Sequence, residues 1–142
     1  MTRTHRQAGF TLIELLIVIA ILAVLAAILI PNFVRSRASA LLATCQLDLR
    51  NIAYALDIYY NENQVYPDAS NWQTTLESGG YIRSVPRSPI DRAPYAYATN
   101  ATRTNFVLSD GPNKYTQAGV TGYVVYTPVG GVLVGAPSVP TP

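Results

Sequence analysis

The sequence predicts an α+β fold, in which one long N-terminal helix precedes a small antiparallel β-sheet. Three observations predict it. An apolar run extends over 10–30, apolar residues then recur at alternating spacings of three and four as far as Tyr59, and four short runs rich in tyrosine, valine and phenylalanine follow Pro94. The chain has 142 residues, and the 111 that follow Pro31 suffice for one modest domain.

The apolar run predicts a membrane-spanning helix. Its 21 residues, Phe10 to Ile30, include only two polar side chains, Thr11 and Glu14. At about 1.5 Å of rise per residue, such a helix spans roughly 30 Å, the thickness of the hydrocarbon core of a bilayer. A cleaved secretory signal is the alternative, because the N-terminus is basic. It fits less well, since the small residues Ala8 and Gly9 precede the run and the far end is Ile30-Pro31.

Glu14 needs an explanation, because a carboxylate at the centre of a membrane costs about 2.5 to 3.5 kcal/mol. In one interpretation it is shallow and its side chain reaches the lipid headgroups. In the other it serves a partner: Glu14 lies one helical turn after Phe10, so a cut between Gly9 and Phe10 would place a new amine about one turn from the carboxylate.

The segment Gly9-Phe10-Thr11-Leu12-Ile13-Glu14 closely resembles the N-terminus of type IV prepilins and type II secretion pseudopilins. A short basic leader precedes it, and the apolar helix with Pro31 at its end follows. The resemblance implies that a prepilin peptidase removes residues 1–9 on the cytoplasmic side and methylates the amine of Phe10. It also implies that Glu14 pairs with the terminal amine of a neighbouring subunit, and it assigns Phe10, Glu14 and Pro31 to assembly.

The segment 32–61 is predicted to continue the helix as an amphipathic second half. One face carries Leu42, Cys45, Leu49, Ile52, Leu56 and Tyr59. The polar residues Arg35, Arg37, Asp48, Arg50 and Asp57 are expected to face water. The whole helix is expected over Phe10–Asn61, with Pro31 bending or locally opening it because proline lacks a backbone donor.

A globular head is predicted over 62–135. A loop should begin near Tyr66-Pro67-Asp68, and a short helix should follow from Trp72 to Gly79, capped by Ser70 or Asn71. The predicted strands are 95–99, 105–109, 122–127 and 132–134, with Val129-Gly130-Gly131 as the last turn. The proline-rich tail 136–142 should be extended or loose.

This order of elements resembles the pilin fold, in which the sheet packs on the second half of the helix. Two stretches, 61–67 and the segment from Tyr81 to Tyr97, look like the head of the major type II secretion pseudopilin. Cys45 is the only cysteine, so the intramolecular disulfide found in many type IV pilins is impossible here. We expect Cys45 to be a buried core residue rather than a reactive thiol.

The charge balance argues against a general nucleic-acid binder. Ten basic residues stand against eight acidic ones, and loss of Arg3 and Arg6 with the leader would make the mature chain neutral. Arginines and tyrosines of the head could nevertheless contact DNA during DNA uptake, with solvated arginines as the alternative. The residues concerned are Arg83, Arg87, Arg92, Arg103, Lys114, Tyr81, Tyr95, Tyr97 and Tyr115.

Catalysis and cofactor binding are not predicted. The one histidine, His5, lies in the expected leader, and no catalytic or metal-binding motif is present in the sequence. The resemblance raises the possibility of calcium, because major pseudopilins commonly bind it in a C-terminal loop. Asp110-Gly111-Pro112-Asn113 is the nearest candidate, with Asp91 as a distant one, but two side-chain ligands are too few and an ordinary turn is favoured.

The predicted function is therefore that of a filament-forming subunit, either of a type IV pilus or of a type II secretion pseudopilus, serving secretion, adhesion and motility, or DNA uptake. The alternative is a single-pass, membrane-anchored binding protein that does not polymerise. The expected partners are other copies and other pilins, prepilin peptidase, the inner-membrane assembly platform and lipid. Basic residues flank both ends of the apolar run, so the orientation, with the head outside the cytoplasm, comes from the resemblance.

Overall fold

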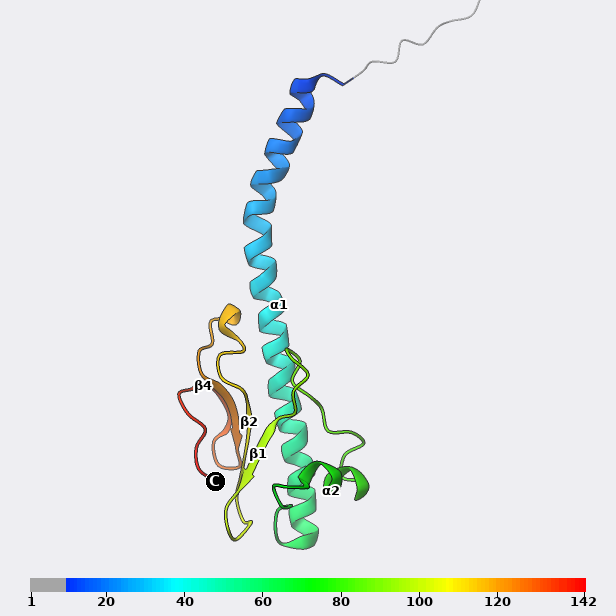
Figure 1. Ribbon diagram of the computed structural model, residues 1–142, viewed down its shortest axis with the longest axis vertical. Helices are drawn as coiled ribbons and strands as arrows, with labels where there is room; N and C mark the ends of the chain where they lie inside the picture. Colours follow the sequence, from blue (N-terminus) through cyan, green and yellow to red (C-terminus); the bar gives the residue numbers. More distant parts are fainter. Residues whose placement is uncertain (1–9) are drawn as a thin grey trace, which may run out of the picture. The chain divides into compact units, whose positions relative to one another are not determined.

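The computed structural model describes residues 10–142; the expected leader, including the cleavage-site residue Gly9, lies outside the described residues. The first element is helix α1, Leu12–Asn63, which begins and ends two residues later than predicted (Figure 1). The helix continues through Pro31 and does not open there. One missing donor does not break a helix whose neighbouring turns keep their bonds. The chain divides after Arg35 into two units, which are described separately.

In the second unit, one face of α1 is buried, as predicted. Its buried residues are Ala38, Cys45, Leu49, Ile52, Ala53, Ala55 and Leu56. Leu42 and Tyr59 are partly buried against the same core. Two residues depart from the expectation that the polar side chains face water. Asp48 and Asp57 are partly buried because tyrosine hydroxyls from the head donate hydrogen bonds to them.

The head contains a four-stranded antiparallel sheet in the order β1-β2-β3-β4, which confirms the predicted fold class. The strands are β1, Ala96–Thr99; β2, Phe106–Asp110; β3, Tyr123–Thr127; and β4, Gly131–Ala136. The last strand is longer than predicted, because Gly131 and Ala136 both pair with β3. The turn is therefore 128–130 rather than 129–131.

A short helix, α2, spans Trp72–Ser78 and buries Trp72 and Leu76. Its N-cap is Asn71, one of the two predicted residues, although the Asn71 side chain makes no capping bond. A single 3-10 turn, η1, covers Thr116–Ala118 and was not predicted.

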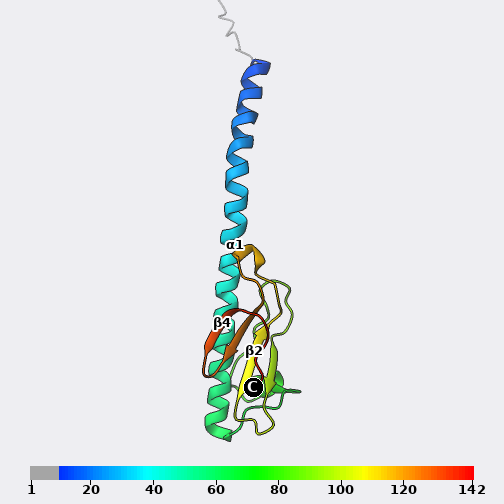
Figure 2. The same cartoon turned by 90° about the vertical axis from the view of Figure 1, so that its left-hand side faces the viewer.

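Strand β2 is buried along its whole length. Phe106 and Leu108 belong to the core cluster that includes the buried face of α1, and Figure 1 shows the sheet alongside this part of the helix. Val107 and Ser109, which alternate with them, must face the other side of the sheet. Figure 2 shows the C-terminal segment after β4 on that side of the sheet. Residues 137–142 form no helix or strand and are mostly exposed, which agrees with the predicted extended or loose tail.

Aromatic side chains fill the part of this core that lies beside α2 and the loop at Tyr66. The ring of Phe106 lies 4.7 Å from that of Tyr66 and 5.9 Å from that of Tyr126, and the ring of Trp72 lies 5.1 Å from that of Tyr97. Such pairs each contribute about 0.5 to 1.5 kcal/mol beyond the area they bury. They join α2 and the loop at Tyr66 to the central strand.

Two leucines on α1 provide a test of this packing. Leu49 is fully buried, whereas Leu47 is 57% exposed. Leu49→Ala is expected to lower the free energy of unfolding by about 2 to 5 kcal/mol, because it leaves a cavity. Leu47→Ala should change it by no more than about 0.5 kcal/mol. Denaturation of the full chain in detergent, followed by Trp72 fluorescence, measures both, and equal losses would contradict the packing described.

Candidate functional site

The N-terminal end of α1 forms a capping box. The Glu14 side-chain oxygen Oε2 accepts hydrogen bonds from the Thr11 backbone N–H and the Thr11 hydroxyl, both at 2.8 Å. In return, the Glu14 backbone N–H donates to the Thr11 hydroxyl at 3.3 Å. These bonds satisfy donors that the first turn of a helix otherwise leaves without partners. Sequence analysis missed this role, although the spacing Thr-x-x-Glu is its signal.

The apolar residues that follow have no cover within the described structure. Phe10 is 87% exposed, and the large apolar side chains from Leu12 to Phe33 are all exposed. Helix α1 is the one described helix that is long and apolar enough to cross a membrane. Apolar surface on this scale is stable only against lipid or against other apolar surfaces.

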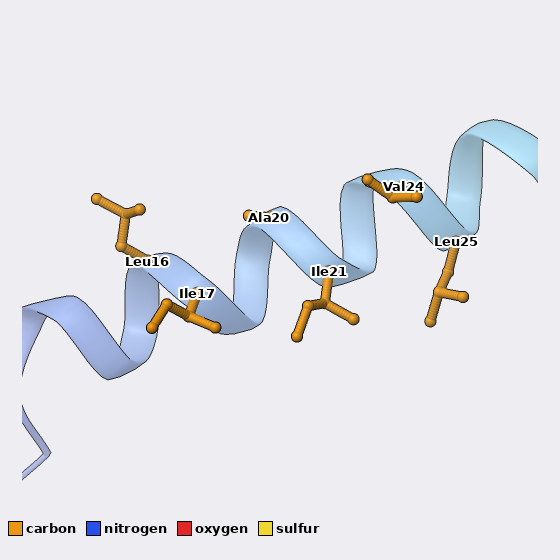
Figure 3. A pocket seen from close by; sticks show the side chains of 6 residues that line it. All are labelled: Leu16, Ile17, Ala20, Ile21, Val24 and Leu25. Carbon is orange, nitrogen blue, oxygen red and sulfur yellow. The ribbon is translucent and has the colours of Figure 1, made fainter.

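The exposed side chains of this segment form regular ridges and a groove. Figure 3 shows two parallel rows of side chains, Leu16, Ala20 and Val24 in one and Ile17, Ile21 and Leu25 in the other, with an apolar groove between them. The members of each row are four residues apart, which is the ridge that a second helix uses when it packs against the first. Ala20 lowers one ridge at its middle, and small residues permit close approach of helices in membranes.

In the head, Asp110 is the centre of a buried polar cluster. Its side chain is 1% exposed. Oδ2 accepts hydrogen bonds from the hydroxyls of Ser88 and Tyr115, both at 2.8 Å, and contacts the Cys45 thiol at 3.7 Å. Oδ1 accepts from the Gly111 backbone N–H at 2.9 Å. A buried carboxylate requires such partners.

The positive charge in this cluster is Lys114. Its Nζ lies 2.5 Å from Asp110 Oδ1 and 2.9 Å from Asp91 Oδ2, and it donates to the Ser88 hydroxyl at 3.4 Å. Burial alone would lower the pKa of Lys114, but the hydrogen bonds to Asp110 and Asp91 raise it above its ordinary value. The ammonium therefore remains charged at neutral pH.

The calcium candidates of the sequence are thus partly brought together. Asp91 and Asp110 approach one another through Lys114, whose ammonium lies between them. Asn113 does not join them, because its side-chain oxygen accepts from the Gly122 backbone N–H at 2.8 Å. Within residues 10–142, no group of three or more histidine, cysteine, aspartate or glutamate side chains is arranged to hold a metal ion.

Cys45 is a core residue, as predicted, with a fully buried side chain. Burial, the largest effect, raises the pKa of its thiol to about 11, and the nearby Asp110 carboxylate acts in the same direction. A thiol with so high a pKa is scarcely ionised at neutral pH and is a poor nucleophile.

Three of the four tyrosines that the sequence offered for DNA, Tyr95, Tyr97 and Tyr115, are engaged in the head, whereas Tyr81 is only partly buried. Tyr95 is buried, and its hydroxyl donates to Asp48 at 3.0 Å across the interface with α1. Tyr115 is buried against Asp110. The hydroxyl of Tyr97 donates to the carbonyl of Pro67 at 2.9 Å, and burial raises the pKa of Tyr97 to about 12. Rings in these positions do not stack on bases.

The N-terminal region matches a known motif, the prokaryotic N-terminal methylation motif, over residues 4–30. Type II secretion system core protein G of Pseudomonas aeruginosa is 31% identical over 117 residues, which cover 73% of this chain and 82% of that protein. The protein of the same name from Klebsiella pneumoniae is 36% identical over 98 residues, covering 60% of this chain and 70% of that protein.

A pilin is also among the relatives. Type IV major pilin protein PilA of Myxococcus xanthus is 41% identical over 66 residues, which cover 46% of this chain and 30% of that protein. The motif at the start of α1, the helix-and-sheet architecture and these relatives agree with one another. The chain therefore belongs to the family of type IV pilins and type II secretion pseudopilins.

Proposed function

We propose that this chain is the repeating subunit of the short filament of a type II secretion system, and that it has no catalytic role. The observation that carries this proposal is the uncovered apolar half of α1 with a single carboxylate at its entry. The relationship to core protein G supports the choice of secretion. It extends over 117 residues, more than the 52 of α1, and so includes part of the head.

A type IV pilus subunit is the second candidate. It is favoured by the 41% identity with a major pilin, although that match covers only 30% of the pilin. Both candidates share the same assembly step and differ in where the filament ends and what it moves. DNA uptake is not part of the proposal, because Tyr95 and Tyr115, two of the tyrosines considered for it, are engaged in the core of the head.

We propose that the chain is first inserted in the inner membrane, with α1 as the anchor and the head outside the cytoplasm. Prepilin peptidase cuts between Gly9 and Phe10 and methylates the new amine. Phe10, the residue that follows the proposed cut, is 87% exposed. The subunit then leaves the lipid through the assembly platform and joins other copies, and the segment around Pro31 enters the filament with the rest of the apolar half.

Glu14 is proposed to neutralise the amine of a neighbouring copy during this step. Its Oε2 is already bound by Thr11, and no hydrogen bond to Oε1 is found within the described part of the chain. A carboxylate can accept about four hydrogen bonds, so the capping box leaves capacity for a second partner. In an apolar surrounding, such a charge pair is stronger than it is in water.

The head is proposed to need no calcium, because Lys114 supplies the positive charge from within the chain. Its ammonium contacts both carboxylates that a cation would use. Metal and lysine would compete for the same space and the same charges.

The first prediction from this proposal concerns processing. Gly9→Val should leave the chain uncut, because the peptidase requires a residue without a side chain before the scissile bond. Intact-mass measurement of the native protein should give a chain that begins at methylated Phe10, and the variant should retain Met1. A native chain that begins at Met1 contradicts the proposal.

The second prediction concerns the charge of Glu14. Glu14→Gln keeps the capping box, since glutamine also serves at this position, but removes the charge. We expect it to abolish filament formation and secretion as fully as deletion of the gene does, with normal amounts of protein in the membrane. Surface pili should be unaffected in both strains.

A matched control separates the two roles of this site. Thr11→Val removes the capping hydroxyl and keeps the Glu14 charge, so it should assemble. Normal secretion by the Glu14→Gln strain would show that the charge has no part in assembly. Loss of surface pili on deletion, with secretion intact, would favour the type IV pilus instead.

The third prediction concerns Lys114. Lys114→Met leaves the buried charge of Asp110 uncompensated and should lower the free energy of unfolding by about 3 to 5 kcal/mol. Asp91→Asn removes the partner that is 46% exposed and should lower the free energy of unfolding far less than Lys114→Met does. Millimolar calcium should raise the melting temperature of Lys114→Met and leave the wild type unchanged. A wild type that melts earlier in the presence of a chelator contradicts the proposal.

A further inference from the structure

The loop between α2 and β1 holds Arg92 in a strained backbone conformation. Its φ is 61°, in the left-handed region that glycine and asparagine favour. The Arg92 backbone N–H donates to the Ser88 carbonyl at 3.0 Å, and the Ser88 backbone N–H donates to the Ala93 carbonyl at 2.9 Å, so the loop is closed on itself. Glycine would adopt this backbone at lower energy. The fold therefore does not explain why the residue is an arginine.

The same loop presents a second arginine. Arg87 donates through Nη1 to the Arg92 carbonyl at 3.4 Å, and Ile90 between the two is 42% exposed. Both arginines are exposed, and neither forms an ion pair with another residue of the described chain. The neighbouring Asp91 is already bound to Lys114. We call residues 87, 90 and 92 the basic loop.

Glu62 is an acidic residue in a locally unfavourable position. It lies in the last turn of α1, where the helix dipole is negative, and no basic residue of that turn compensates it. Its Oε2 accepts a hydrogen bond from the Tyr81 hydroxyl at 2.6 Å, whereas Oε1 receives none within residues 10–142. Glu62 is exposed and forms no ion pair in this part of the chain. A positive group from another molecule would stabilise both the carboxylate and the helix end.

The basic loop and Glu62 lie at different levels of the head. Ser88 and Cys45 both contact Oδ2 of Asp110, so the loop is level with Cys45 of α1. Glu62 comes 17 residues after Cys45, which is about 25 Å further along the helix at 1.5 Å per residue. Figure 1 shows the segment between α2 and β1 extending along α1, away from the C-terminal end of the helix. The loop and the carboxylate therefore do not meet within one chain.

Most charged side chains of the head have no partner of opposite sign in their own chain. Within the described residues, the ion pairs of Lys114 with Asp91 and Asp110 are the only two. The segment 36–142 nevertheless contains seven basic and seven acidic residues, so its charges balance. A surface for anionic lipid would instead have an excess of positive charge. The balance favours a second copy of the chain, which supplies both signs. The unpaired residues are Arg37, Arg50, Arg83, Arg87, Arg92, Arg103, Asp48, Asp57, Glu62, Asp68 and Glu77.

We propose that the basic loop of one subunit binds Glu62, at the C-terminal end of α1, of a second copy of this chain. This inference rests on the proposed function, because it identifies a contact between heads in the filament. A guanidinium can bind a carboxylate through two parallel hydrogen bonds. Contact between two different surfaces of one chain can repeat from copy to copy, as a filament requires. Complementary charges of this kind fix the register of the copies.

A charge swap in cells tests this contact on the full chain. Arg92→Glu should reduce the number of filaments per cell by more than about tenfold, because repulsion of Glu62 replaces attraction. The double variant Arg92→Glu with Glu62→Arg should restore the filaments. Arg50→Glu is the matched control, since Arg50 is an exposed arginine outside the basic loop, and it should leave the number unchanged. Processing at Gly9 and the amount of membrane-bound protein should be normal in all three.

Cysteine crosslinking locates the contact while leaving the three charged residues in place. Ile90→Cys with Asn61→Cys should form a ladder of disulfide-linked multimers under mild oxidation, whereas each single variant should stay monomeric. Asn61 is exposed and precedes Glu62 in α1. The native Cys45 does not interfere, because its side chain is fully buried. Ile90→Cys with Ser78→Cys, at an exposed site of α2, is the control and should give no ladder.

Arg92→Gly separates assembly from folding. Glycine adopts a positive φ without strain, so the melting temperature of the purified chain should not fall, whereas loss of the guanidinium should still reduce filament number. Normal filaments from Arg92→Gly and Arg92→Glu would overturn the inference. So would a charge swap that restores nothing, which would leave anionic lipid or another protein as the partner of the basic loop.

Two crosslinking results would also overturn the inference. Dimers of the Ile90→Cys single variant would mean that the basic loop meets itself. The absence of a ladder from the double variant, in cells whose filaments are visible by electron microscopy, would mean that the contact is elsewhere while the proposed function survives. The absence of filaments from wild-type cells would instead contradict the proposed function itself.

Discussion

The head depends on the contact between one face of α1 and strand β2. Leu49, Ile52 and Leu56 are fully buried there, opposite Phe106 and Leu108. Each such side chain contributes about 1.5 to 3 kcal/mol on burial. Strand β2 is buried along its whole length. The other strands, α2 and the loop at Tyr66 pack around this contact, as the ring of Tyr66 does against Phe106. Other contacts of the head provide partners for the polar groups that are buried beside this contact.

Asp110 is the clearest example of a buried polar group that receives such partners. It ends β2 on the face directed toward α1, where an unpaired carboxylate would be costly. Ser88, Tyr115, the Gly111 backbone and Lys114 provide its hydrogen bonds, and Asp48 and Asp57 on α1 are satisfied in the same way by Tyr95 and Tyr66. Polar contacts of this kind contribute less to stability than to a unique arrangement of helix and sheet. They also explain why Tyr66, Tyr95 and Tyr115 point inward.

The extent to which the sequence predicted the fold follows from the range of the interactions. The helix and the four strands are visible because their periodicities are local, and their ends are displaced by only one or two residues at most boundaries. The extra length of β4 was missed because Gly131 and Gly135, both at positive φ, look like turn residues although they occur in a paired strand. The Asp110 cluster was missed because two of its members, Ser88 and Cys45, are 22 and 65 residues away from Asp110 in the chain. No local pattern marks such a cluster.

The role proposed for Glu14 would combine a local and an intermolecular contact without conflict. In the single chain its carboxylate closes the first turn of α1 with Thr11, so the charge is partly satisfied before any partner arrives. A neighbouring amine would add a bond and a charge without requiring that the cap be broken, because the second oxygen is not used by the capping box. On the proposed function, the subunit would therefore be stable enough in the membrane before assembly and would still gain free energy on joining the filament. A glutamate with no local partner would be costlier to keep in lipid, and one fully satisfied within its own chain would gain little from a neighbour.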